Sequence, residues 1–576
     1  MKSVFKSISL LIVTIIFSTS VITLGAGDTL YVYANGPFLN EVIGNDTTAT
    51  GEQAHSVYKL VSRDTTYLYS GTLTVKSDFA IIGELGPDGR PPTIQPAVLS
   101  DGSIPSNPFA FTGANTNVVF NNLYILGIAP NGSVSNDGIA IQVSADNIRV
   151  TVDNCVFEEW RAFAIGYNGN WDKFFITNSK FRNMNHPNQW YIGEVLRNEW
   201  PGAAYTDSVV MKYNTIFCVN GYAAAPVTKY YMTYFEFNHN NVVYTFKNPF
   251  FIFNVTDAKI NNNIFYGAWA GGISKQEYPW WDQLWSPEIG SIIDLDTLDL
   301  AKDSVFNPAD IGKDNFRWLS EAKRTIEVKN NAYFWPQQMV DFWTSWNDTA
   351  TVDSIYTVTW MNERTTNMFN DKDHWPGLVE ENNINVDPQF GPSINEVMNN
   401  TSGEYGIGLF NWFAQIRTGT ASTDLWGYKL TQVGSNADWV PAWPLPEKDD
   451  MHYSNTALLT HATDGLPLGD PYWITGTTGI EQEGNILPTE FTLFNNYPNP
   501  FNPSTTIKFN IPETGNVKLK IYNVMGQLVK TVLDENAMEQ GQYKITVDMN
   551  NLSSGIYFYT LEHSGRAITK KMILMK

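Results

Sequence analysis

The chain has 576 residues, of which 43% are hydrophobic and 16% are charged, and its formal net charge is −21. This length exceeds one ordinary globular core unless the core is built from repeats. The apolar content describes a folded chain and excludes a disordered one. The negative charge argues against nucleic acid as a partner, because phosphate backbones are bound by basic surfaces.

The first 26 residues have the features of a secretory signal peptide. Lys2 and Lys6 stand beside an apolar run over residues 8–17, and small residues follow. We expect cleavage between Ser20 and Gly27, which would export the chain. An uncleaved membrane anchor is the alternative, although the run is short and is interrupted by hydroxyl residues. No other segment is expected to span a bilayer, so the mature chain should have no transmembrane segment.

A short phrase recurs along the chain: alternating apolar residues, an asparagine, a small or polar residue, and usually an aromatic two residues later. Before the asparagine lies a strand-like alternation, as in Ile148-Arg149-Val150-Thr151-Val152. Seven asparagines hold this position, at intervals of 33, 24, 36, 26, 22 and 68 residues: Asn121, Asn154, Asn178, Asn214, Asn240, Asn262 and Asn330.

The shortest intervals fit one coil of a right-handed parallel β-helix, in which coils stack at about 4.8 Å. Each asparagine would lie at a bend and bond through its amide to the asparagine of the next coil, forming a ladder. Leucine-rich repeats need a Leu-x-x-Leu-x-Leu spacing that is absent, and up-and-down sheets would show shorter, more even intervals. The spacing predicts an all-β rod over residues 27–475, with loop insertions at about 274–322 and 335–383.

The two cysteines, Cys155 and Cys218, would lie in coils two steps apart. That separation is about 9.6 Å along the rod, beyond the ~7 Å that a disulfide tolerates between Cα atoms. We expect two buried free thiols.

Two phrases near the end of this region resemble those of known β-helix proteins. Asn385-Val386-Asp387-Pro388-Gln389-Phe390 resembles the phrase that closes many bacterial β-helices. The stretch from Asp464 to Trp473 resembles the end of the pectate-lyase-like β-helix domains of Bacteroidetes and related phyla. The resemblance covers about residues 27–475 and implies the fold, whereas it says little about activity.

The last 86 residues differ from the rest of the chain. Residues 491–576 hold nine Lys/Arg and six Asp/Glu, a net charge of +3 that leaves −24 for the remainder, and all 19 tryptophans precede residue 491. A polar linker, residues 476–490, separates the two regions. Three alternating runs predict a small antiparallel immunoglobulin-like β-sandwich: Ile507, Phe509 and Ile511; Val517, Leu519 and Ile521; Tyr543, Ile545 and Val547.

Four strings in this region resemble the type A C-terminal sorting domain of the type IX secretion system. They span residues 496–507, 521–526, 552–559 and 569–574. The resemblance implies export to the periplasm, passage across the outer membrane by the type IX machinery, and location at the outer-membrane surface or outside the cell. In that family the tail is commonly removed and the cargo is released or joined to surface lipopolysaccharide. A plain immunoglobulin-like accessory domain is the alternative.

Two residues are candidates for catalysis of polysaccharide cleavage. An inverting polygalacturonase needs converging aspartates with Gly-His-Gly and Arg-Ile-Lys motifs, and only Asn136-Asp137-Gly138 approaches that pattern. A pectate lyase needs carboxylates that hold Ca²⁺ and a base for the C5 proton. Asp137 begins a stretch that resembles a lyase strand, although Gln142 replaces its second aspartate, and Lys229 stands near the position of the base. The simpler interpretations are that Asp137 caps a bend and that Lys229 is solvated.

A second group of charged and aromatic residues lies on loops in the middle of the rod. Aromatic faces stack on sugar C–H surfaces, and guanidinium groups bond hydroxyls, so these residues predict a carbohydrate-binding cleft. The alternative is that the aromatic side chains pack the loops onto the rod. The predicted binding residues are Trp160, Arg161, Arg182, His186, Trp190, Arg197 and Trp200.

Calcium is the one cofactor that the sequence suggests. Asp137 is one potential ligand, and Asp294, Asp296 and Asp299 form a short acidic run. That run lacks the glycine and the distant glutamate of an EF-hand, and a solvated acidic loop is the other interpretation.

Two functions remain open at this point. The first is an exported β-helix that binds or cleaves polysaccharide, as a lyase or a glycoside hydrolase if it is an enzyme. The second is a non-catalytic structural or adhesive surface protein. In both, residues 491–576 would engage the type IX secretion machinery.

Overall fold

The computed structural model describes residues 29–34, 36–49, 53–61, 66–86, 89–135, 137–186, 192–198, 205–225, 232–250, 252, 255–272, 291–297, 321–349, 358–400, 408–418, 432–433, 438–439, 451–464, 466–475, 481–482, 491–496, 499–502, 504–513, 515–538, 541–549 and 552–575. The expected signal peptide, residues 1–26, lies outside the described residues.

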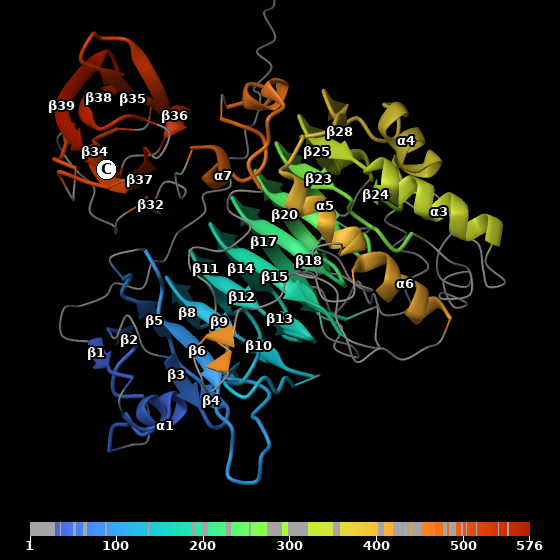
Figure 1. Ribbon diagram of the computed structural model, residues 1–576, viewed down its shortest axis with the longest axis vertical. Coiled ribbons are helices and arrows are strands. Elements are labelled where there is room, and N and C mark those ends of the chain that lie inside the picture. Colours follow the sequence, from blue (N-terminus) through green and yellow to red (C-terminus); the bar gives the residue numbers. More distant parts are fainter. Residues whose placement is uncertain are drawn as a thin grey trace, which may run out of the picture.

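Three parallel sheets form a rod in the described part of the chain (Figure 1). Successive strands along the chain pass from one sheet to the next, and strands of neighbouring coils pair in parallel, as β11 does with β14. The parallel β-helix predicted from the asparagine spacing is therefore confirmed.

The eleven-stranded sheet contains β1 (Thr29–Val32), β2 (Val57–Leu60), β5 (Phe79–Gly83), β8 (Asn117–Asn121), β11 (Arg149–Asp153), β14 (Asp172–Thr177), β17 (Thr206–Lys212), β20 (Met232–Asn238), β22 (Val255–Asn261), β25 (Thr325–Lys329) and β28 (Leu378–Glu381). The ten-stranded sheet contains β3 (Thr66–Tyr69), β6 (Thr93–Pro96), β9 (Tyr124–Leu126), β12 (Val156–Glu158), β15 (Lys180–Met184), β18 (Thr215–Val219), β21 (Asn241–Thr245), β23 (Ile264–Tyr266), β26 (Ala332–Phe334) and β29 (Ile384–Asn385). The six-stranded sheet contains β4 (Leu73–Val75), β7 (Phe109–Phe111), β10 (Ile139–Val143), β13 (Phe163–Tyr167), β16 (Glu194–Asn198) and β19 (Ala224–Ala225).

The rod is filled by columns of apolar side chains. Because successive side chains of a strand point to opposite faces, every second residue enters the core. Val150 and Val152 of β11 pair with Phe174 and Ile176 of β14, and all four are fully buried. Each such side chain contributes on the order of 1.5–3 kcal/mol on burial, so the repeated alternation drives coil stacking.

The bend between the eleven-stranded and ten-stranded sheets, the ladder corner, has a left-handed residue in each coil from β8 to β28. Asn154, Asn178, Asn262 and Asn330 occupy this position, with φ of 50° to 59°. Asparagine tolerates this conformation better than most residues because its short side chain bonds locally.

The following residue of the bend forms a buried ladder. The backbone nitrogen and Nδ2 of Asn214 donate to Oδ1 of Asn240, at 3.0 and 2.9 Å. The same pair of bonds joins Asn240 to Asn263, Asn263 to Asn331, and Asn331 to Asn383. Each Nδ2 also donates to a backbone carbonyl of the eleven-stranded sheet.

The seven asparagines expected to form one ladder therefore occupy three adjacent columns. Only Asn214 and Asn240 are in the buried ladder, four lie at the left-handed position, and Asn121 is the last residue of β8. The sequence does not show which column an asparagine occupies where two asparagines are adjacent, as in Asn262-Asn263, because either one fits the recurring phrase. In two coils the left-handed residue is Tyr213 or His239 instead of an asparagine, so the residue type does not mark this position consistently along the chain.

A returning segment, residues 451–464 and 466–475, runs back along the ladder corner. The ring of His239 lies between the carboxylate of Asp464, at 2.8 Å, and the carbonyl of Gly469, at 3.1 Å. Further along, Trp473 donates from Nε1 to Oγ1 of Thr215, at 2.6 Å. The stretch whose sequence resembles the end of a β-helix domain thus packs over the rod's own bends.

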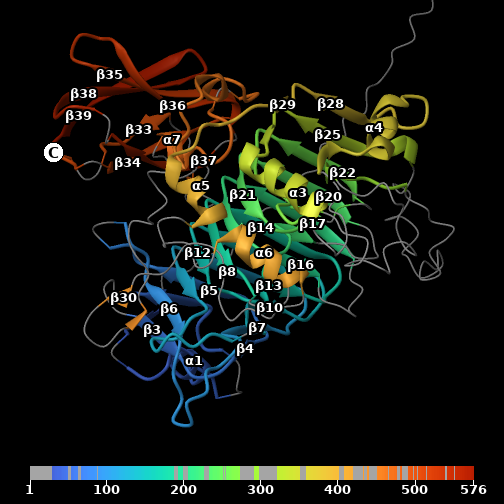
Figure 2. The ribbon, with the colours of Figure 1, turned by 45° about the vertical axis from the view of Figure 1, so that its right-hand side comes forward.

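Helices cover the last coils of the rod (Figure 2). Trp343 of α3 (Gln337–Thr349) donates from Nε1 to the carbonyl of Ala270. Trp412 of α6 (Leu409–Arg417) packs on Phe246, with 4.9 Å between the ring centroids. The remaining elements of this region are α1 (Leu39–Gly44), α4 (Glu363–Asn370), α5 (Pro392–Asn399), α7 (Tyr472–Thr475), the 3₁₀ turns Glu321–Lys323 and Thr456–Leu459, and the pairs β24 (Ser291–Ile293) with β27 (Thr359–Met361) and β30 (Gln432–Val433) with β31 (Asp438–Trp439).

The two expected insertions differ in how far the structure describes them. Residues 291–297 and 321–322 are the described part of the first, residues 274–322. The second, residues 335–383, holds α3, β27 and α4, and its last residues return to the rod as β28. Leu378 of β28 is buried, whereas Val379 is exposed and two glutamates follow it, so the strand lacks the alternation that marks earlier coils.

The C-terminal region is a separate antiparallel sandwich. One sheet contains β32 (Glu481–Gln482), β33 (Thr492–Leu493), β34 (Ser504–Ile511) and β37 (Gly541–Asp548), and the other contains β35 (Gly515–Asn523), β36 (Leu528–Met538), β38 (Gly555–His563) and β39 (Arg566–Leu574). All nine apolar residues predicted to alternate inward are buried in its core. The sandwich predicted from the sequence is confirmed.

Both cysteines are buried and free, as predicted. Cys155 precedes β12 and Cys218 lies in β18, with the coil of β15 between them. Among the described residues, no helix is both long and apolar enough to cross a bilayer.

We predict that Asn240→Ala destabilises the rod by about 2–4 kcal/mol, because the substitution strips buried groups of Asn214 and Met211 of their bonding partner. The measurement is urea unfolding followed by circular dichroism. Asn117→Ala is the control, since Asn117 is half-buried on the outer face and its side chain makes one long bond of 3.3 Å to Asp78. Equal losses in the two variants would contradict a special role for the ladder.

Candidate functional site

The bend between the ten-stranded and six-stranded sheets, the loop corner, gathers ionisable groups from several coils. Each coil from β12 to β21 has a left-handed residue there: Glu159, Asn183, Cys218 and Tyr244, with φ of 52° to 60°. Because the coils pair in register, side chains at equivalent positions lie one above another. Stacking therefore assembles a cluster from residues that are far apart in the sequence.

A buried ion pair lies at the base of this cluster. Glu158 of β12 pairs in register with Arg182 of β15, and both side chains are buried. Arg182 donates from Nε to Oε1 of Glu158 at 2.8 Å, Asn183 donates to the same oxygen at 2.7 Å, and the Tyr124 hydroxyl donates to the other oxygen. Breaking such a pair from one side costs about 3–5 kcal/mol, so it supports the corner.

Glu159 is a second buried acid of the corner. Burial, with the neighbouring charge of Glu158 adding to it, raises the pKa of Glu159 to about 8, against the opposing effect of Arg161 and Arg182. The carboxyl group is therefore largely protonated at neutral pH and can exchange a proton there. Burial and the charge of Arg161 lower the pKa of His186, against the opposing charge of Asp137.

A further carboxylate, Glu194, is held between two cations. It is fully buried beneath Gly221, where a Cβ atom would lie only 2.0 Å from its Cγ. Arg197 donates to it at 3.2 Å, and Nζ of Lys247 lies 3.9 Å from it. Lys247 also lies 4.3 Å from the ring centroid of Tyr222. Burial raises the pKa of Glu194, and the two cations oppose this rise.

Some of the predicted binding residues are buried in the rod, and others are partly exposed to solvent. Trp160 is buried in the rod core, donates from Nε1 to the carbonyl of Ile125 at 2.9 Å and lies against Gly138. Its ring is not open to a sugar, which corrects the expectation of a stacking platform. Arg182 and His186 are also buried, whereas Arg161 and Arg197 are partly exposed.

Asp137, one candidate for catalysis and for calcium, is exposed in the turn before β10. Its charge acts on His186, so it belongs to the loop corner. Gln142, the residue in place of a lyase aspartate, accepts a bond from Asn107 at 3.0 Å. The other candidates Lys229, Trp190, Trp200 and Asp299 lie outside the described residues.

The acidic run proposed for calcium is engaged by arginine in the structure. Asp294 is buried and accepts from Arg364 and from Asn362, each at 2.8 Å, and Asp296 lies 3.1 Å from Arg364. Burial raises the pKa of Asp294 to about 6, against Arg364. In the part of the chain that the structure describes, no three His, Cys, Asp or Glu residues are grouped to hold a metal ion.

Sequence reasoning did not single out Tyr222 and Lys247 for the site. Lys247 follows the left-handed residue Tyr244 by three residues, as His186 follows Asn183, whereas Tyr222 follows Cys218 by four. The repeated offset of three residues was the available signal for Lys247. It was hidden because the left-handed residues of this corner share no side-chain type.

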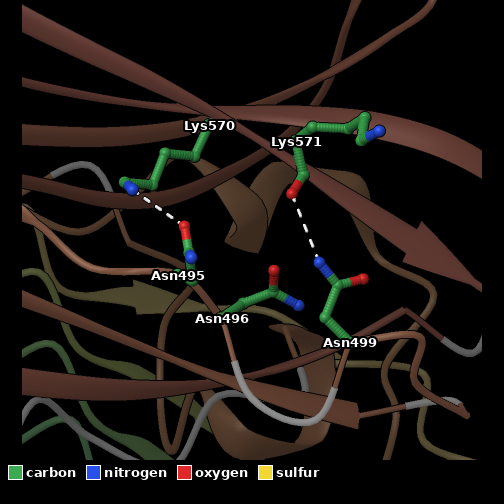
Figure 3. Close-up of a pocket in the computed structure, with 5 residues that line it drawn as sticks. All are labelled: Asn495, Asn496, Asn499, Lys570 and Lys571. Carbon is green, nitrogen blue, oxygen red and sulfur yellow. Dashed lines mark hydrogen bonds between the residues drawn. The ribbon is translucent and has the colours of Figure 1, made fainter.

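A second polar site lies in the sandwich, where its first loop meets its last strand (Figure 3). Lys570 donates from Nζ to Oδ1 of Asn495 at 2.8 Å, and Ile573 donates its backbone nitrogen to Oδ1 of Asn499 at 2.9 Å. Together with Asn496 and Lys571, residues 495, 499 and 570 line a cavity of about 420 Å³. The opening and closing strings of the region are thus bonded to each other.

Residues 495–575 match the family model described as the secretion system C-terminal sorting domain. This segment is a type IX secretion C-terminal sorting domain. The chain is therefore exported to the cell surface or the extracellular space, and its sorting domain is handled by the type IX machinery. No curated protein and no solved structure matches the chain.

We predict that Glu159→Gln changes the pH dependence of stability. Between pH 4.5, the ordinary pKa, and about 8, the folded protein holds a proton on Glu159 that the unfolded chain has released. The free energy of unfolding of the wild type therefore falls across this window, by up to about 1.4 kcal/mol per pH unit, and the variant lacks this fall. Urea midpoints measured from pH 4 to 9 should show the variant gaining on the wild type up to about pH 8. Glu41→Gln on the exposed side of α1 is the control, and a pH-independent difference for Glu159→Gln would contradict the assignment.

We also predict that a chain lacking residues 491–576 accumulates in the periplasm, because the sorting domain is what directs passage across the outer membrane. Fractionation of a type IX-competent host with surface protease treatment measures the result. The full chain with Asn117→Ala, a change on the outer face of the rod, is the control and should reach the surface. Undiminished surface delivery of the truncated chain would refute the role of the domain.

Proposed function

We propose that the exported rod binds an acidic polysaccharide at its loop corner. The observation that carries the proposal is a local excess of positive charge in a protein whose net charge is −21. Arg161, Arg182, Arg197 and Lys247 supply four cations, while the pKa of Glu159, raised to about 8, leaves that carboxyl largely neutral. Three carboxylates oppose the four cations: those of Glu158, Glu194 and Asp137.

The partly exposed guanidinium groups of Arg161 and Arg197 suit the carboxylate of a uronate sugar. Arginine binds carboxylates through a planar fork of donors, which gives directional bonds as well as charge. Tyr222 lies beside Arg197 and Lys247, and its buried ring supports these two cations from within the rod. The resemblance of residues 464–473 to the end of pectate-lyase-like domains favours a carbohydrate ligand in general.

A non-catalytic display role is the second candidate. It is favoured by the burial of Trp160, Arg182 and His186, three of the predicted binding residues. In this role the ion pairs of the loop corner would only stabilise the stacked coils, and the rod would carry its loops to the surface without binding a glycan.

We predict that the mature full-length chain binds polygalacturonate or another uronate polymer in calorimetry and binds neutral xylan or glucan more weakly. The double variant Arg161→Ala/Arg197→Ala should bind at least about tenfold more weakly, a loss of about 1.4 kcal/mol or more. Arg149→Ala is the matched control, since Arg149 lies on the outer face of the eleven-stranded sheet over the ring of Phe175.

Turnover is measured in the same samples through the ultraviolet absorbance of an unsaturated uronate product and through reducing ends. Product that disappears with Glu159→Gln would extend the proposal from binding to cleavage, because a carboxyl group titrating near pH 8 can transfer the proton. Absence of binding to every polymer by the wild type would reject the proposal in favour of the display role.

A further inference from the structure

The sorting domain exposes a group of large apolar side chains at one end of the sheet formed by β35, β36, β38 and β39. Val524, Met525 and Leu528, at the turn between β35 and β36, are 67%, 74% and 52% exposed. Ile556 and Phe558 of β38 are exposed as well. These five residues are the apolar tip. Single exposed apolar residues are ordinary on a protein surface, whereas a contiguous group of them marks an interaction surface.

Strand register shows that the apolar tip is contiguous. Tyr522 pairs with Leu528 on one side and with Phe558 on the other. These residues alternate with the inward-facing Ile521 and Tyr559, so they form a row across the outer face of three strands. Asn523 pairs with Tyr557, which brings Ile556 to the same end of the sheet as the turn.

The turn that carries Val524 and Met525 is held by its own hydrogen bonds. Asn523 donates its backbone nitrogen to the carbonyl of Gln527 at 3.0 Å. Its side-chain Oδ1 accepts from the backbone nitrogens of Met525 and Gln527, each at 3.0 Å. The two apolar side chains are therefore presented to solvent by a fixed turn.

Lys571 is the cation beside the apolar tip, since it pairs in register with Phe558. Lys520, two residues before Tyr522 on the same face, lies 3.5 Å from the carboxylate of Glu562, so its charge is already paired. The whole region of residues 491–576 carries a net charge of +3, whereas the rest of the chain carries −24. A partner that covers the tip must therefore combine an apolar surface with acidic groups at its edge.

The apolar tip lies on the sheet that faces away from the rod. In the opposite sheet, Lys544 of β37 lies near enough to the ladder corner for its charge to act on Asp153. Figures 1 and 2 both place β37 between the rod and the strands β35, β38 and β39. A receptor can thus reach the tip while the rod is still attached.

We propose that the apolar tip is the docking surface through which a protein of the type IX machinery holds the sorting domain. The receptor offers an apolar hollow bordered by carboxylates, into which the side chains of Val524, Met525 and Leu528 insert. A few desolvated apolar anchors supply most of the binding energy in such an interface, and the charge of Lys571 sets its orientation.

The test is surface delivery of the full chain in a type IX-competent host, measured by fractionation and surface protease treatment. Met525→Asp and the double variant Val524→Ser/Leu528→Ser should each lower the delivered fraction about tenfold and leave the protein in the periplasm. Phe494→Ser is the matched control, because Phe494 is exposed elsewhere in the sorting domain and bonds through its backbone. Circular dichroism and urea unfolding of the purified full-length variants establish that they are folded. Met525 is so exposed that its replacement leaves the core intact.

Delivery of both folded variants at the wild-type level would overturn the proposal. Two results would reassign the surface in that case. A wild-type dimer in light scattering that the variants lose would identify a second copy of the chain as the occupant. Binding of wild type, but not of the variants, to anionic phosphatidylglycerol vesicles would identify a lipid surface.

Discussion

The rod depends on hydrogen bonding between bends of successive coils. A parallel β-helix leaves a bent backbone with buried polar groups at every corner, and each such group needs a partner. At the ladder corner, Asn214, Asn240 and Asn263 supply it, because one carboxamide accepts from the coil on one side while its nitrogen donates to a strand carbonyl. These bonds satisfy buried groups of the bends and keep neighbouring coils in register. The returning segment then covers the same corner, so the ladder is shielded along the middle of the rod.

The alignment of coils that is fixed at the ladder corner also decides which ionisable side chains lie side by side at the loop corner. Once the coils are aligned, Glu158 must lie beside Arg182, and residues of later coils follow in the same column. A charged group in such a column is desolvated by the coils on either side, which explains why the pKa of Glu159 is raised and that of Arg161 is lowered. The loop corner can therefore hold several arginines and a protonated carboxyl group within a strongly acidic protein. That combination is the physical basis for proposing a uronate ligand.

The two parts of the chain solve different problems. The described part of the rod buries large side chains such as Trp160 and Trp412 in its core, and the rod carries the negative charge. The sorting domain is small and net basic, and it leaves Val524 and Met525 in solvent on a fixed turn. Because β37 lies toward the rod, the opposite sheet stays open to a receptor while the rod is attached. Negative charge thus belongs to the rod, which is the cargo, whereas net positive charge and exposed apolar side chains belong to the sorting domain.

The sequence by itself determined the stacked fold, the free cysteines and the sorting domain, because these follow from periods and strings that are local or regularly repeated. For example, the alternation of Ile507, Phe509 and Ile511 indicates the buried face of a strand, and it does so without knowledge of which strands lie beside it. The phase of the asparagines needed the tertiary structure, since Asn262 and Asn263 fit the phrase equally well and only the hydrogen bonds to the next coil distinguish them. The candidate site needed it too: Trp160 reads as a surface aromatic, yet it fills the core, and Tyr222 and Lys247 join Glu194 only through stacking. Burial and cross-coil contacts are properties of the assembled rod, so no single stretch of sequence contains them.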